Sequence, residues 1–233
     1  MEHELREIVI PLDAGERTGA LVYPAHPAAA AGRRPATLIL AHGAGAGLRH
    51  PFMIGFALAL RERGLDVVTF NFLYMHQGRH VPDRMPQLVA CYRAVIAATR
   101  ESLESARERL FIGGKSMGGR AATHVASEDP ALPLKGIVLL GYPLHPPGRP
   151  DRPRDAHLPG VKRPMLVVQG ARDSFGTPDE LTPVLAKLAP SPTLHTVEGG
   201  DHSFKISGKD ARKQAVAYGE IQDTIVAWID RTS

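Results

Sequence analysis

The segment at 114–118, GKSMG, matches the pattern G-x-S-x-G, and its central residue is Ser116. An apolar run (RLFIGG) ends just before this serine, and a helical pattern (GGRAATHVASE) begins just after it. This order is typical of a tight strand–turn–helix that exposes a serine hydroxyl beside a helix N-terminus, where developing negative charge is favoured. The small residues Gly114 and Gly118 suit such a crowded turn. The segment therefore predicts that Ser116 is a nucleophile.

Two later segments could activate this hydroxyl. A serine needs a base that takes its proton, and the base needs an acid that orients it. Asp173 lies in GARDS, after the apolar run PMLVVQG, and His202 lies in GGDHS, after the run TLHTVEG. The order serine, acid, histidine and the position of each just past a predicted strand favour a triad of Ser116, Asp173 and His202.

Other acids and histidines remain alternatives. Three further carboxylates could serve as the acid, the first because it adjoins the histidine and the others more weakly: Asp201, Asp151 and Asp155. Three further histidines are weaker bases, one within a strand pattern and two in a loop where they could at most touch substrate: His195, His145 and His157. Only His202 lies in the loop before the final helical pattern.

Acyl transfer also needs N–H donors aimed at the developing oxyanion. One predicted donor is the backbone of Met117, and the other comes from the glycine-rich loop after TLILAHG, at Ala44 with Gly45 as an alternative. Gly43 and Gly45 would let that backbone approach a substrate closely, while His42 is expected to support the loop. Three aromatic residues that follow strands could line an acyl pocket or belong to the core: Phe72, Tyr74 and Tyr142.

Two phosphate-binding patterns can be set aside. A P-loop ending at GKS would need a glycine at position 109, which is Arg109. A dinucleotide fingerprint starting at Gly43 would need a glycine at position 48, which is Leu48, and an acidic residue where the next strand ends in Asn71.

The elements that must position these residues alternate between strands and helices. The predicted strands span 4–12, 19–24, 37–43, 65–72, 109–114, 136–144, 164–170 and 193–199, the first two antiparallel at the sheet edge. The predicted helices span 51–63, 82–103, 117–127, 178–188 and 209–230, and loops are expected at 24–35 and 145–163. This alternation predicts one α/β domain over residues 1–233, with a mostly parallel, doubly wound sheet of about seven or eight strands.

Composition sets the wider limits. The chain has 233 residues, 43% of them hydrophobic and 22% charged, which is ordinary for one globular domain. The net charge of +4, without a dense lysine run, gives little support for nucleic-acid binding. The one cysteine excludes an intramolecular disulfide. The start, MEHELREIVIPL, lacks a secretory signal and no apolar run could span a bilayer, so we expect a cytoplasmic protein without membrane partners.

The segments HGAGAG, GGKSMGGR, GARDSFG and GGDHSF, in this order, resemble the dienelactone-hydrolase-like branch of the α/β-hydrolase superfamily. More narrowly, NFLYMHQGR, GGKSMGGRAA and GYPLHPPGRP resemble a small group of testis-expressed and histone-acetyltransferase-complex hydrolase-like proteins. The resemblance implies a compact fold without a large cap and a Ser116–Asp173–His202 triad. Dienelactone hydrolases carry a cysteine nucleophile where this chain has Ser116, which argues against dienelactone as the substrate.

These observations predict a serine hydrolase that cleaves an ester-type bond through an acyl-enzyme, as a carboxylesterase or thioesterase. The expected partner is a small acyl ester or thioester, with no metal or organic cofactor, and the expected state is a monomer or homodimer. The alternative is a binding or scaffold protein that kept the fold without catalysis. Four arginines of the 145–163 loop could attract an acidic substrate or could simply be solvated: Arg149, Arg152, Arg154 and Arg163.

Overall fold

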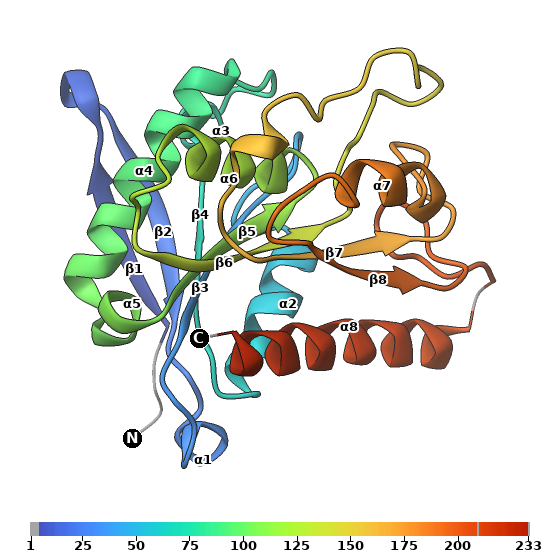
Figure 1. The fold of residues 1–233 in the computed structure, drawn as a ribbon. Helices are drawn as coiled ribbons and strands as arrows, with labels where there is room; N and C mark the ends of the chain where they lie inside the picture. The colour runs from blue at the N-terminus through green and yellow to red at the C-terminus, as the bar shows by residue number, and fades with distance from the viewer. Residues whose placement is uncertain (1–4, 209, 233) are drawn as a thin grey trace.

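The structure is a computed structural model that describes residues 5–208 and 210–232. The described strands form one eight-stranded sheet in the order β1-β2-β4-β3-β5-β6-β7-β8 (Figure 1). β1 and β2 pair antiparallel at one edge, β2 pairs antiparallel with β4, and all the other neighbours are parallel. The strands are β1 (Arg6–Pro11), β2 (Arg17–Tyr23), β3 (Thr37–Ala41), β4 (Asp66–Phe70), β5 (Leu110–Lys115), β6 (Leu134–Leu140), β7 (Met165–Gly170) and β8 (Thr193–Val197).

Helices cover both faces of this sheet (Figure 1). α4 (Met85–Ser102), α6 (Met117–Glu128) and α7 (Pro178–Leu185) pack on one face, and α2 (Pro51–Arg61) and α8 (Ala211–Arg231) pack on the other. Shorter helical segments complete the described part: α1 (Pro27–Ala30), α3 (Leu73–His76), α5 (Glu104–Glu108), η1 (Asp13–Gly15) and η2 (Leu158–Gly160).

The central strands are apolar throughout because helices bury both of their faces. Every residue of β3 is buried, and its side chains alternate between two cores. Leu38 and Leu40 join the core beneath α2 and α8, whereas Ile39 and Ala41 join the core beneath α4 and α6.

This architecture confirms the predicted fold class, and the differences concern the ends of elements. The helix expected from residue 82 begins at Met85, with Arg84 as its N-cap, and the helix expected to reach 188 ends at Leu185. The strand expected to reach 144 ends at Leu140, since Gly141 takes a φ of 65° that breaks the extended backbone. Three short helices, α1, α3 and α5, were not expected. Residues 4 and 209, the first of a predicted strand and of a predicted helix, lie outside the described residues.

The parallel register brings the carboxyl ends of the central strands together. Ala41, the last residue of β3, stands opposite Phe70 of β4 and Gly114 of β5. Gly170, the last residue of β7, stands opposite Val197 of β8. The loops that follow these strands therefore meet at one edge of the sheet, where such folds bind ligands.

Among residues 5–208 and 210–232, no helix combines the length and the apolar character that a membrane crossing requires.

Candidate active site

Ser116 lies in the turn between β5 and α6 with a left-handed backbone, at φ 51° and ψ −116°. A non-glycine residue adopts this conformation only when its surroundings hold it there. The flanking glycines are required by space: a Cβ on Gly114 or Gly118 would lie 2.5 Å or 2.4 Å from the carbonyl oxygen of Ala41. The turn therefore presses against the end of β3, and the Ser116 N–H donates to Leu140 O of β6 at 3.0 Å.

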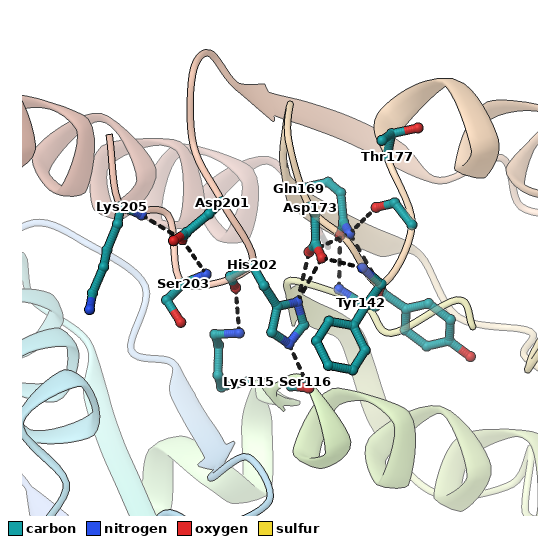
Figure 2. A network of polar contacts seen from close by, with 12 residues as sticks. Lys115, Ser116, Tyr142, Gln169, Asp173, Thr177, Asp201, His202, Ser203 and Lys205 are labelled. Atoms are coloured by element: carbon teal, nitrogen blue, oxygen red, sulfur yellow. Dashed lines mark hydrogen bonds and ion pairs between the residues drawn. The ribbon is translucent and has the colours of Figure 1, made fainter. Parts of the chain in front are cut away.

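The Ser116 hydroxyl contacts His202, which lies in the loop after β8 (Figure 2). Ser116 Oγ is 2.8 Å from His202 Nε2, and His202 Nδ1 is 2.9 Å and 2.8 Å from the two oxygens of Asp173. An ionised Asp173 can only accept, so the hydrogen of a neutral imidazole belongs on Nδ1 and leaves Nε2 free to accept the Ser116 proton. The structure thus brings together the three residues that the sequence predicts as nucleophile, acid and base.

Asp173 is held from several sides (Figure 2). Its side chain is fully buried, and its oxygens accept hydrogen bonds from Gln169 Nε2 and from the Phe175 N–H, both at 2.8 Å. Gln169 is in turn fixed by Tyr142, whose N–H donates to Gln169 Oε1 at 2.8 Å, and by the carbonyl of Gly176, which accepts from Gln169 Nε2 at 2.7 Å. Each lone pair that Asp173 offers away from the imidazole therefore has a donor, which keeps the carboxylate in one orientation.

His202 has two further supports. The ring of Phe175 stacks on its imidazole at a centroid distance of 4.2 Å. Lys115 Nζ donates to the main-chain carbonyl of His202 at 2.6 Å (Figure 2). Burial lowers the pKa of Lys115 to about 8, and the carboxylates Asp173 and Asp201 partly oppose that shift.

The alternative acids are engaged elsewhere. The Asp201 carboxylate accepts from the N–H groups of Ser203 and Lys205 at 2.7 Å and 2.9 Å, so it closes its own loop rather than reaching the imidazole (Figure 2). Asp151 is exposed and pairs with Arg149. Asp155 makes no bond to His202 in the described part of the chain.

The alternative histidines also lie away from Ser116. His145 is bonded to Glu180 at 3.2 Å, and His157 to Thr123 at 2.8 Å. His195 is half-buried in β8, where burial lowers its pKa.

The loop after β3 lies against the nucleophile. A Cβ on Gly43 would be 3.6 Å from Ser116 Cβ, and Gly43, Ala44 and Met117 all line the same pocket as Ser116. No hydrogen bond to another described residue uses the Ala44 N–H, and Met117 opens α6, where N–H groups have no intrahelical partner. Both predicted oxyanion donors therefore border the pocket.

His42 holds this loop in place. Its Nδ1 lies 2.8 Å from Gly43 O, and its Nε2 accepts the Phe72 N–H at 3.1 Å, so the ring is neutral with the hydrogen on Nδ1. Burial lowers the pKa of His42 to about 4, consistent with this neutral bridge.

The pocket has a volume of about 900 Å³ and opens beside Ser116 and His202. The aromatic residues suggested by the sequence as its lining do not reach it. Phe72, Tyr74 and Tyr142 are buried in the core, which they share with residues of α4 and α6. Gly45, at φ 71°, shapes the loop but is not part of the pocket wall. The observed apolar wall instead includes Phe52 of α2 and Tyr218 of α8, whose ring centroids lie 6.1 Å apart.

Sequence reasoning missed several residues of this site. Lys115 directly precedes Ser116, and Phe175 lies two residues after Asp173, so proximity in sequence was an available signal. Gln169 sits inside an apolar run, where a lone amide is a signal of a buried hydrogen-bond network. Arg120 lies in the first turn of α6, four residues after Ser116, so proximity in sequence was a signal there too. Within the described residues, no group of three His, Cys, Asp or Glu side chains is arranged to hold a metal ion.

A mostly parallel sheet with a serine at a strand–helix turn and an acid and a histidine in later loops defines an α/β-hydrolase fold. The sequence matches the alpha/beta hydrolase domain family over residues 34–230, and the chain belongs to that family.

Solved structures with the same fold include an α/β serine hydrolase without a lid from Xanthomonas campestris, at 23% identity over 100% of this chain and 99% of that chain, with a TM-score of 0.74. A dienelactone hydrolase from Anabaena variabilis has 20% identity over 99% of both chains and a TM-score of 0.72. Est1E from Butyrivibrio proteoclasticus has 14% identity over 96% and 98% of the two chains and a TM-score of 0.71. These TM-scores establish a shared fold, which a dienelactone hydrolase also has, and the narrower testis-expressed group stays a prediction.

Proposed function

We propose that this chain is a serine hydrolase that cleaves an ester-type bond of a small acyl substrate, as a carboxylesterase or thioesterase. The observation that carries the proposal is the continuous chain from Ser116 Oγ through the His202 imidazole to Asp173, with contacts of 2.8 to 2.9 Å, at the mouth of a pocket. We further propose that residues 1–233 act as one domain, since the three residues come from three loops spread over its second half.

The reaction begins when His202 Nε2 takes the Ser116 proton as Oγ attacks the acyl carbon. Asp173 accepts the hydrogen bond from His202 Nδ1–H and stabilises the imidazolium that forms. The imidazolium then protonates the leaving alcohol or thiol, which leaves an acyl group on Ser116. His202 then takes a proton from a water molecule as the water oxygen attacks the acyl-enzyme. The bond between the acyl carbon and Ser116 Oγ breaks, His202 returns its proton to Oγ, and the carboxylic acid leaves.

The negative charge on the tetrahedral intermediate is assigned to the N–H groups of Ala44 and Met117. Neither needs to break a hydrogen bond within the described chain in order to donate, and both border the pocket at Ser116. Loss of one such donor typically lowers the rate by ~10²–10³-fold.

The proposal predicts that Ser116→Ala lowers hydrolysis of p-nitrophenyl acetate by ~10⁴-fold or more, because it removes the hydroxyl that His202 activates. A fluorophosphonate probe should label the wild-type chain at Ser116, as read by peptide mass spectrometry. A panel of esters and matched thioesters of increasing acyl length then ranks the two bond types.

The matched control is Ser174→Ala, which removes an exposed hydroxyl next to Asp173 in sequence. This variant should keep both turnover and labelling, and the thermal unfolding of both variants should match the wild type. A folded wild-type chain that hydrolyses none of the panel and takes up no probe would instead support the binding or scaffold function.

A further inference from the structure

The arginines of the loop at 145–163 have separate roles. Arg149 pairs with Asp151, with both nitrogen–oxygen distances at 3.1 Å, and Arg152 lies 3.9 Å from the same exposed carboxylate. Arg163 donates to the carbonyls of Pro130 and Leu132 at 3.0 Å and 2.9 Å, at the start of β6. The guanidinium groups of these three arginines thus bind a surface carboxylate or main-chain carbonyls, and none of them lines the pocket.

Arg154 is the loop arginine that reaches the pocket. Its main chain is fixed just past β6: its N–H donates to Leu144 O at 2.7 Å, and its carbonyl accepts the Tyr142 hydroxyl at 2.8 Å. Since Tyr142 is buried in the core, the backbone of Arg154 is anchored rather than loose. The side chain therefore projects from a fixed point into the same pocket as Ser116.

Arg120, in the first turn of α6, lines the same pocket. Its N–H donates to Ser116 O at 3.1 Å, which ties the start of α6 to the serine turn. Burial lowers the pKa of Arg120, and the like charge of Arg154 adds a smaller effect in the same direction.

Neither guanidinium has a partner in the described part of the chain. Arg120 and Arg154 make no ion pair and donate no side-chain hydrogen bond to described residues, and Arg120 Nε is buried without an acceptor. The carboxylate in the pocket wall, Asp83, is already bound by Arg79 at 2.7 Å and by the Tyr74 N–H at 3.1 Å. Two neighbouring cations without an acid are unfavourable when partly desolvated, so an anion that enters the pocket would be stabilised there.

We propose that Arg120 and Arg154 form an anion-binding subsite beside Ser116, so that the ester or thioester substrate carries a carboxylate or phosphate group. This proposal rests on the proposed hydrolase function for its catalytic part. Guanidinium groups bind both anions through paired N–H donors, and they do so more strongly than neutral donors. The apolar wall at Phe52 and Tyr218 leaves room in the same pocket for an uncharged portion of the substrate.

The kinetic test compares p-nitrophenyl hemiglutarate with neutral p-nitrophenyl valerate. The wild type should prefer the anionic ester in kcat/KM. Arg120→Gln and Arg154→Gln should each lower kcat/KM for the anionic ester by about 10- to 100-fold, chiefly through KM, and lower kcat/KM for the neutral ester far less. Arg154→Lys should show more of the preference for the anionic ester than Arg154→Gln does, because lysine keeps the positive charge but lacks the paired N–H donors.

The matched control is Arg149→Gln, which removes a charge from the same loop outside the pocket wall and should leave the preference intact. A wild-type enzyme that cleaves the neutral ester as efficiently as the anionic one, or a preference that survives in folded Arg120→Gln and Arg154→Gln, overturns the subsite.

A binding test separates failure of the subsite from failure of the hydrolase function. Ser116→Ala is titrated by calorimetry with monomethyl glutarate and with methyl phosphate, which tell carboxylate from phosphate. Saturable binding that is lost when Arg154→Gln is added supports the subsite even if no ester is turned over. Absence of binding by both probes overturns it even if neutral esters are hydrolysed.

Discussion

At the scale of single residues, polar neighbours hold the acid and the base of the candidate triad in place. Gln169 and the Phe175 N–H fix Asp173, and Lys115 fixes the main chain of His202. Lys115 is a buried cation whose amine bridges the serine turn and the histidine loop, since it directly precedes Ser116. Its hydrogen bond sets the position of the imidazole without touching the reacting atoms.

We therefore expect Lys115→Met to lower kcat for a p-nitrophenyl ester by about 10-fold while KM changes little, because a small displacement of the base weakens proton transfer more than substrate binding. Steady-state kinetics at pH 7 measure this. The matched control is Lys162→Met, because Lys162 also donates to a carbonyl, that of Pro159 at 2.7 Å, but on the exposed surface. Equal kcat values for Lys115→Met and the wild type would remove Lys115 from the positioning of His202.

At the scale of elements, His42 joins the end of β3 to the end of β4. The same ring contacts the carbonyl of Gly43, in the predicted oxyanion loop, and the N–H of Phe72, after β4. A protonated ring would present a donor to the Phe72 N–H and lose this bond. The joint between the two strand ends therefore depends on a neutral imidazole.

This contact between the two strand ends predicts that the free energy of unfolding falls as the pH is lowered. The pKa of His42 is about 4 in the folded chain, against an ordinary value of 6.5, so below pH 6.5 the unfolded chain takes up a proton that the folded chain does not. The stabilisation is complete above pH 6.5 and is lost as the pH falls toward 4. Between pH 7 and 4.5, urea unfolding should show the wild type losing about 2 kcal/mol more than His42→Gln.

The comparison is made within each variant across pH, so a general loss of stability in His42→Gln does not affect it. His80→Gln, which changes an exposed histidine, should keep the wild-type pH dependence. If the wild type and His42→Gln lose the same free energy over this range, the ring is not held neutral by burial.

At the scale of the whole molecule, Arg109 ties the start of β5 to the last helix. Its guanidinium is buried and donates to the carbonyls of Ile229 at 2.7 Å and Thr232 at 3.1 Å, at the end of α8, and to Arg34 O at 3.0 Å. A cation at this place also complements the negative end of the α8 dipole. The Arg109 side chain thus holds the end of α8 against the start of β5, at the end of that strand away from Ser116.

We expect Arg109→Met to lower the free energy of unfolding by about 2–4 kcal/mol, because it leaves carbonyls without their charged donor. Urea unfolding measures the loss, and the folded variant should keep its activity because the candidate site lies at the opposite end of β5. Arg107→Met is the matched control: Arg107 also donates to two carbonyls, those of Arg100 and Glu101, but it is exposed and should cost under about 1 kcal/mol. Equal losses in the two variants would show that burial of Arg109 adds nothing.

The amino-acid sequence by itself determined the alternation of strands and helices and the turn at Ser116. These features are local: apolar runs of strand length, helical spacing and paired glycines can each be recognised within a few residues. The grouping of Ser116, Asp173 and His202 was also predictable, because parallel strands place the loops after their carboxyl ends at one edge of the sheet.

Only the tertiary structure decided which side chains face the pocket. Phe72, Tyr74 and Tyr142 follow strands at the right edge, yet they are buried in the core with residues of α4 and α6. Of the four loop arginines, the structure brings Arg154 to the pocket, which Arg120 of α6 also lines. The direction and partners of a side chain depend on packing between elements far apart in sequence, and no local pattern contains that information.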